Sequence, residues 1–149
     1  MYKHILVATD GSELAGKGLD HGLRLAKTLD AAVTVLTVTE PTMVAGSGAG
    51  MAWTTGAELM EELIRSNKEH ADKVLGAARS AAEGQGVAVE TVHVADRYAG
   101  DAIVETAAER GHDLIVMASH GRRGLGRLLL GSQAADVLSR AAMPVLIVK

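Results

Sequence analysis

DLIVMASHGRRGLGRLLLGSQAADVLSRAAMPVLIVK, residues 113–149, decides the fold of this chain. It begins with Leu114–Ala118, a short continuous apolar run typical of a strand that is covered on both faces. A loop rich in glycine and arginine follows, after which Gly131 and Ser132 open a helix. The sequence therefore predicts a strand, a basic loop and a helix in succession, and an α/β protein holds phosphate groups at such a place.

The loop and the helix start have the chemistry of an anion site. The first amides of a helix have no internal partners, and the helix dipole adds partial positive charge there. Gly121 and Gly131 would let backbone N–H groups approach phosphate oxygens, while the Ser132 hydroxyl can cap the helix or donate to phosphate. Arg122 and Arg123 add positive charge. A plain turn with solvated arginines is the alternative, which we place second because three arginines and four glycines gather at one strand-to-helix crossing.

Two well-known phosphate motifs are absent from this loop. Residues 126–132 have the four-residue gap of a Walker A loop but lack its lysine. A dinucleotide fingerprint also fails, because Leu129 stands where the third glycine of G-x-G-x-x-G is needed. The loop is therefore of a third kind.

Strand and helix patterns alternate along the rest of the chain. We expect strands at residues 4–9, 32–39, 87–94, 114–118 and 145–148, and helices at residues 13–29, 57–83, 100–110 and 131–141. Strands separated by helices pair in parallel through right-handed crossovers, so we expect an open, doubly wound α/β sheet with helices on both faces. Residues 41–56 follow neither period and read as a lid-like loop, in which Trp53 could pack over a base or anchor the loop.

Length, charge and cysteine content narrow the class of protein. A chain of 149 residues suits a single domain over residues 1–149. The net charge of −3 gives no general attraction to nucleic acid or to a membrane surface, so the basic loop favours a small anionic partner. The chain has no cysteine, no apolar run of membrane-spanning length and too short an apolar stretch before Asp10 for a signal peptide. We expect a soluble cytoplasmic protein with no membrane or nucleic-acid partner.

The six histidines include no close ligand pair, so a transition-metal site is not expected. Only His120 lies in the proposed phosphate loop. It could contact phosphate when protonated, or it could shape the turn together with Ser119.

The loop resembles the ATP-binding signature of the universal stress protein family, written as G, two residues, G, nine residues, G and then S or T. Ala118, Gly121, Gly131 and Ser132 occupy these positions with the correct gaps, alanine replacing the first glycine. The segments HILVATDGSELA and MPVLIVK are similar to the family's first strand and turn and to its last strand. The resemblance covers essentially the whole chain.

The resemblance implies the adenine nucleotide alpha hydrolase-like fold, with five parallel strands in the order 3-2-1-4-5. That order places Asp10, at the end of the first strand, across the crevice from the glycine loop. The family's Asp at this position contacts the nucleotide, and a carboxylate there could also bind Mg²⁺ or Mn²⁺. A turn stabilised by Asp10 is the alternative from sequence alone. Val38, in LTVTE, matches the position whose backbone meets the adenine edge, although a plain strand valine fits the pattern as well.

The function implied is that of an ATP-binding regulatory or signalling module of the stress response. ADP or AMP are the other adenine nucleotides we consider, with Mg²⁺ or Mn²⁺ beside the phosphates. No residue is an evident base for attack by water, so we expect hydrolysis to be slow or absent. Family members also form homodimers through the last strand, here Val145–Val148, which would otherwise leave an unpaired edge. A nucleotide-independent interaction protein on the same fold and a weak ATPase are the alternatives.

Overall fold

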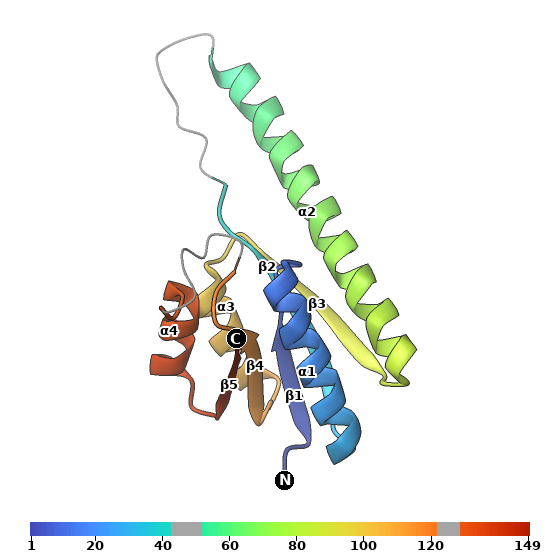
Figure 1. The fold of residues 1–149 in the computed structure, drawn as a ribbon. Coiled ribbons are helices and arrows are strands. Elements are labelled where there is room, and N and C mark those ends of the chain that lie inside the picture. Colours follow the sequence, from blue (N-terminus) through green and yellow to red (C-terminus); the bar gives the residue numbers. More distant parts are fainter. Residues whose placement is uncertain (43–51, 122–128) are drawn as a thin grey trace.

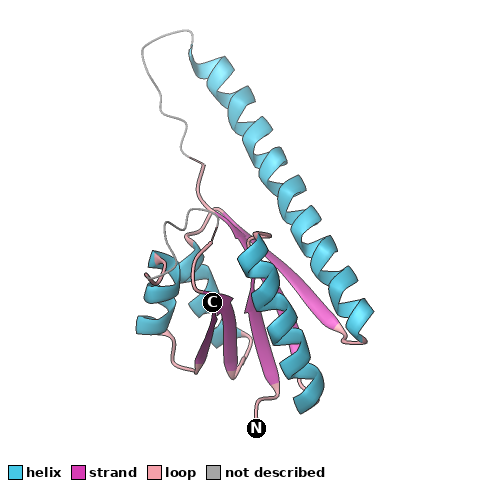
Figure 2. Ribbon diagram, in the orientation of Figure 1, coloured by secondary structure: helices cyan, strands magenta, loops and turns pink. Residues whose placement is uncertain are grey.

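The sheet has five parallel strands in the order β3-β2-β1-β4-β5 (Figure 1). The computed structural model describes residues 1–42, 52–121 and 129–149. The strands are β1 (His4–Ala8), β2 (Ala32–Thr39), β3 (Val89–Ala95), β4 (Leu114–Ala118) and β5 (Val145–Val148). The helices between them are α1 (Glu13–Leu29), α2 (Ala52–Gln85), α3 (Ala99–Glu109) and α4 (Ser132–Arg140) (Figure 2). The predicted fold class and strand order are confirmed.

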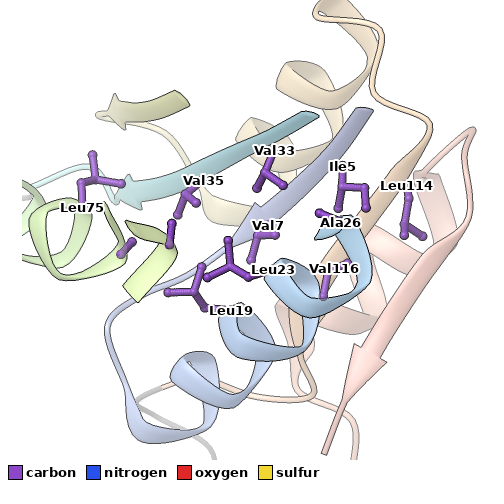
Figure 3. Close-up of a cluster of buried hydrophobic side chains, with 12 residues drawn as sticks. Ile5, Val7, Leu19, Leu23, Ala26, Val33, Val35, Leu75, Leu114 and Val116 are labelled. Carbon is purple, nitrogen blue, oxygen red and sulfur yellow. The ribbon is translucent and has the colours of Figure 1, made fainter. Parts of the chain in front are cut away.

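Helices cover both faces of the sheet, which explains why the central strands are apolar along their length. On one face α1 and α2 pack against the sheet, and Leu23 of α1 lies against Val7 of β1 (Figure 3). On the other face α3 and α4 contribute Ile103 and Val137 to a second cluster. All five side chains of β4 are buried, as expected for a strand with a helix on each side.

Helix α1 starts and packs through particular residues. Its N-cap is Ser12, whose Oγ accepts a hydrogen bond from the Ala15 N–H at 3.2 Å. At Gly22 a Cβ atom would lie 2.7 Å from Cγ2 of Val7, so glycine there allows the helix to lie close to the sheet. The short connection of residues 9–12 places the N-terminus of α1 next to the carboxyl end of β1.

The pairing of β1 with β4 is fixed at the amino ends of the two strands. The Asp113 carboxylate, directly before β4, accepts hydrogen bonds from the N–H groups of Lys3 and His4 at 2.8 and 3.1 Å. The paired residues then run from Ile5 opposite Leu114 toward the carboxyl ends. The two strands therefore end side by side, which brings the residues after β1 close to those after β4.

Helix α2 differs from the prediction at its start. It begins at Ala52, so residues 52–56 are helical and Trp53 lies within α2, whereas we predicted a loop over residues 41–56. Residues 43–51 of that loop lie outside the described residues. The first part of α2 extends past the carboxyl ends of the strands (Figure 1). Leu59 and Ile64, in that part of the helix, are exposed. The helical period is weak in this part because no sheet lies beneath it.

In the described part of the chain, no helix combines the length and the apolar character that crossing a bilayer would require.

Candidate functional site

A crevice lies where the carboxyl ends of β1 and β4 meet. The chain proceeds from β1 to β2 on one side and from β4 to β5 on the other, so this is the point at which the strand order reverses. In open α/β sheets, ligands bind at this point. A cavity of about 120 Å³ occupies the crevice. Of the residues that we predicted for the site, five line it: Asp10, Val38, Ala118, His120 and Gly121.

Asp10 and Gly121 lie in contact across the crevice. A Cβ atom on Gly121 would come within 2.5 Å of Oδ2 of Asp10, so only glycine leaves the carboxylate in its present position. The other oxygen, Oδ1, accepts a hydrogen bond from the Ser12 N–H at 3.0 Å. Asp10 thus stabilises the turn into α1 and also faces the glycine loop, so the two interpretations of this residue are compatible.

The backbone of Val38 faces the crevice for a reason of strand geometry. The last hydrogen bond from the β1 side to β2 is donated by the Thr9 N–H to the Leu36 carbonyl at 2.9 Å. Alternate residues of a strand direct their backbone groups to the same neighbour, so Val38 directs its N–H and C=O to the side of β1, beyond the end of that strand. A donor and an acceptor therefore lie next to each other at the edge of the cavity.

The start of α4 differs from the prediction in one respect. Gly131 is the N-cap residue, and Ser132 is the first helical residue rather than the cap. The Gly131 N–H donates to the Ser119 carbonyl at 2.7 Å, and a Cβ atom on Gly131 would lie 2.9 Å from that oxygen. Any residue can adopt the φ of −61° at Gly131, so the backbone angle does not require glycine. Glycine is needed because a Cβ atom would not fit against Ser119. The amides that remain for an anion are those of the first turn, beginning with Ser132.

His120 lies at the rim of the site and contacts its neighbour. Its Nδ1 lies 3.1 Å from Oγ of the buried Ser119, within hydrogen-bond distance. This contact stabilises the turn after β4, as one of the two interpretations of His120 proposed. The residue also lines the cavity, so its ring is close to any ligand there.

Arg122 and Arg123 lie outside the described residues. Gly131 and Ser132 are described and begin α4, but they are not among the residues that line the cavity. Within the described ranges, no three histidine, aspartate or glutamate side chains gather in a way that would hold a metal ion.

The other eight lining residues were not predicted for the site, and three of them come from α3 and α4. Ala99 and Ile103 come from the first turns of α3, and Gln133 comes from the first turn of α4. Gln133 directly follows the predicted Ser132, so its position at a helix start was a usable signal. No sequence motif near Ile103 indicates a site residue, because α3 reaches the crevice only through the tertiary fold.

The comparison with known proteins agrees along the full length of the chain. The model of the universal stress protein family matches residues 1–149. Universal stress protein MJ0531 of Methanocaldococcus jannaschii is 36% identical over 149 residues, covering 100% of this chain and 83% of that protein.

Two solved structures are similar in fold. Protein MJ0577, also from M. jannaschii, has a TM-score of 0.81 and 30% identity, with 100% of this chain and 96% of that chain covered. A universal stress protein solved in complex with cAMP has a TM-score of 0.74 and 26% identity, with 99% and 97% covered.

Proposed function

This chain belongs to the universal stress protein family, and on that premise we propose that it is an ATP-binding regulatory module of the stress response. The proposed site is the crevice between the carboxyl ends of β1 and β4. The observation that carries the proposal is the convergence of Asp10, Val38 and Gly121, from three separate segments, on one cavity. Each offers a group suited to a different part of a nucleotide.

The base and the ribose fit the part of the crevice nearest the strands. The N–H and C=O of Val38 would pair with the edge of adenine, as a neighbouring donor and acceptor can. The Asp10 carboxylate would accept hydrogen bonds from ribose hydroxyls. The cavity, about 120 Å³, is smaller than the roughly 300–1,000 Å³ of sites that enclose a whole small molecule. It would therefore hold only part of the nucleotide, and the phosphates would extend toward α4.

The phosphates would lie against the start of α4. Its free first-turn amides and the positive end of its dipole favour an anion there, and the exposed Ser132 adds a hydroxyl. Gly131 contributes by letting α4 start close to Ser119, rather than through its own amide. We include Arg122 and Arg123 in the proposal for their charge, and Ala118 and His120 as walls of the site.

A divalent cation fits this arrangement as part of a nucleotide complex. Asp10 offers one carboxylate, whereas Mg²⁺ in nucleotide sites usually takes one or two carboxylates together with phosphate oxygens and water. We propose that Mg²⁺ or Mn²⁺ enters with ATP, held mainly by the phosphates and by Asp10.

The cAMP complex of a family member supports an adenine nucleotide as the ligand. ADP and AMP contain the same groups that Asp10 and Val38 would bind, so either is a possible second ligand. Slow or absent hydrolysis is part of the proposal, because the histidine and the carboxylate that line the described cavity have other roles: Asp10 would bind ribose or the cation, and His120 contacts Ser119. A steady-state turnover above about 1 per second, an ordinary enzyme value, would contradict it.

We further propose a cytoplasmic homodimer. Strand β5 pairs only with β4, so its outer edge is open in the described part of the chain. Pairing of two β5 edges would satisfy these backbone groups. A cytoplasmic location agrees with ATP as the ligand and with a sequence that has no cysteine.

Two measurements on the purified protein test the main proposal. Acid extraction followed by mass spectrometry identifies any nucleotide that copurifies, and calorimetry with Mg-ATP measures binding to the stripped protein. We expect an adenine nucleotide in the extract and saturable ATP binding, with no binding by an Asp10→Ala, Gly121→Val double variant. An empty extract together with no heat of binding would favour the nucleotide-independent interaction protein instead.

A further inference from the structure

Gln133 joins the starts of two helices at the wall of the crevice. Its Oε1 accepts a hydrogen bond from the Gly100 N–H, in the first turn of α3, at 2.7 Å. Neither α3 nor α4 has a side-chain cap, since Tyr98 and Gly131 make no capping hydrogen bond. The Gln133 side chain therefore satisfies one open amide of α3 from the first turn of α4.

Helices α3 and α4 pack closely where Gln133 lies. A Cβ atom on Gly100 would lie 3.1 Å from Oε1 of Gln133 and would overlap Oδ2 of Asp136, so α3 fits closely against two turns of α4. Arg140 strengthens the contact, with Nη1 2.8 Å from Oδ1 of Asp101 and Nη2 2.6 Å from Oδ2 of Asp136. The hydrogen bond from the Gly100 N–H holds the Gln133 amide directly, whereas the Arg140 ion pairs hold the two helices together and do not touch that amide.

This hydrogen bond also determines which way the amide faces. A backbone N–H is a donor only, so the atom opposite Gly100 must be the oxygen of the Gln133 amide. The amide nitrogen is then the other atom. It has no hydrogen-bond partner among the residues that the structure describes, although Gln133 lines the cavity.

We propose that Gln133 is a specificity-determining residue of the nucleotide site, whose amide N–H donates to a nonbridging oxygen of the phosphate attached to the ribose. The inference rests on the proposed nucleotide site. Asp10, as a carboxylate, accepts hydrogen bonds, whereas the free group of Gln133 donates them. The two residues line one cavity of about 120 Å³, so they reach neighbouring atoms of one ligand. The ligand must present hydroxyls to Asp10 and an acceptor close by to Gln133, as a nucleoside 5′-phosphate does.

Affinity for AMP and for adenosine separates this role from a purely structural one. In Gln133→Met we expect affinity for AMP, ADP and ATP to fall by about tenfold or more, because a hydrogen bond to a charged group is lost. Adenosine has no phosphate, so its affinity should be unchanged. Gln133→Glu keeps an oxygen for the Gly100 N–H but has no donor, and it should lose AMP affinity while retaining the thermal stability of the wild type.

Arg140→Met is the matched control, because it loosens α3 against α4 and leaves the Gln133 amide intact. We expect its AMP affinity to match that of the wild type. Equal weakening of AMP binding in Arg140→Met and Gln133→Met would mean that Gln133 only holds α3 in place, and would overturn the inference. So would an equal loss of AMP and adenosine affinity in Gln133→Met.

Nuclear magnetic resonance gives a direct readout. With ¹⁵N-labelled protein, the Gln133 side-chain amide signal should shift on addition of AMP and show scalar coupling to phosphorus, which a structural tie alone would not produce. Saturable AMP binding with an unmoved Gln133 signal would refute the inference and leave the proposed function intact. A wild-type protein that binds no nucleotide would refute the proposed function itself, and the inference with it.

Discussion

The carboxylate of Asp10, just after β1, lies so close to Gly121 that a Cβ atom there would come within 2.5 Å of Oδ2. The two residues are far apart in the sequence, and the pairing of β1 with β4 brings them together. The glycine at this position is therefore tied to a functional group of the proposed site. It leaves the Asp10 carboxylate in its place beside the cavity.

Gly121→Ala should weaken nucleotide binding without unfolding the protein. The added methyl group would displace the end of a flexible side chain, which can rotate away, so the fold survives while the carboxylate leaves its position. We expect ATP affinity to fall about 5- to 30-fold, which corresponds to one or two kcal/mol. Calorimetry measures the affinity, and thermal unfolding checks the stability.

Gly16→Ala is the control, because Gly16 lies on the exposed side of α1 with no atom within 4 Å of an added Cβ. It should bind ATP like the wild type and gain roughly 0.5–1 kcal/mol of stability from better helix propensity. A Gly121→Ala variant with wild-type affinity would show that the Asp10 carboxylate does not contact the ligand.

Gly131→Ala should instead lower stability. Its Cβ atom would meet the backbone, 2.9 Å from the Ser119 oxygen and 3.0 Å from Cα of His120, so the start of α4 would have to move. Overpacking of this kind costs about 1–3 kcal/mol. Urea unfolding should show this loss of stability. Gly121→Ala should lose much less stability, because its added methyl group would meet only the movable side chain of Asp10. Equal stability of Gly131→Ala and the wild type would mean that α4 starts farther from β4 than the structure has it.

Much of the fold could be predicted because its signals are local. The apolar runs Leu114–Ala118 and Val145–Val148 and the Ser12 cap depend on a few neighbouring residues. Apart from the start of α2, the predicted ends of the helices and strands lie within about two residues of the observed ones. The start of α2 was missed because its first turns extend past the sheet, where no packing imposes a period. Strand order came from the family resemblance, since an apolar run shows that a strand is buried but not which strand lies beside it.

The candidate site was predictable only in part. Asp10 and Gly121 belong to sequence motifs, and the structure brings them to one cavity. Gln133 and Ile103 reach that cavity from helices whose mutual packing no local pattern encodes. The packing role of Gly131 was not foreseen for a similar reason. Its freedom from a Cβ serves the contact with Ser119, and that contact exists only in the folded chain.

Ile147→Pro should separate the proposed dimer into monomers. The Ser119 N–H bonds the Val148 carbonyl, so the backbone groups of Val148 face β4 and those of Ile147 face the open edge. Proline at Ile147 would remove an outward N–H and leave the bonds to β4 in place. Sedimentation at micromolar concentration should give a dimer for the wild type and a monomer for the variant. A wild-type monomer would contradict the proposed dimer.

His112 should make stability depend on pH. Its side chain is buried, with Nε2 2.9 Å from Oγ1 of Thr34 and with Nδ1 lacking a hydrogen-bond partner in the described part of the chain. Burial is the main cause that lowers the pKa of His112 below the usual 6.5. The charges of His4 and Arg110 lower this pKa further, whereas hydrogen bonding to the backbone of Ala107 and Thr106 raises it.

A lowered pKa in the folded state means that the unfolded chain binds the His112 proton more readily. The contribution of neutral His112 to stability is therefore complete above about pH 6.5 and is lost as the pH falls below that value. The urea midpoint should drop between pH 7 and pH 5. His112→Gln keeps a polar group for Thr34 but does not titrate, so its midpoint should vary less over this range. His21 is exposed, so His21→Gln serves as the control. Its urea midpoint should change with pH as that of the wild type does. If the midpoint of His112→Gln changed in the same way, the acid sensitivity would have to come from other groups.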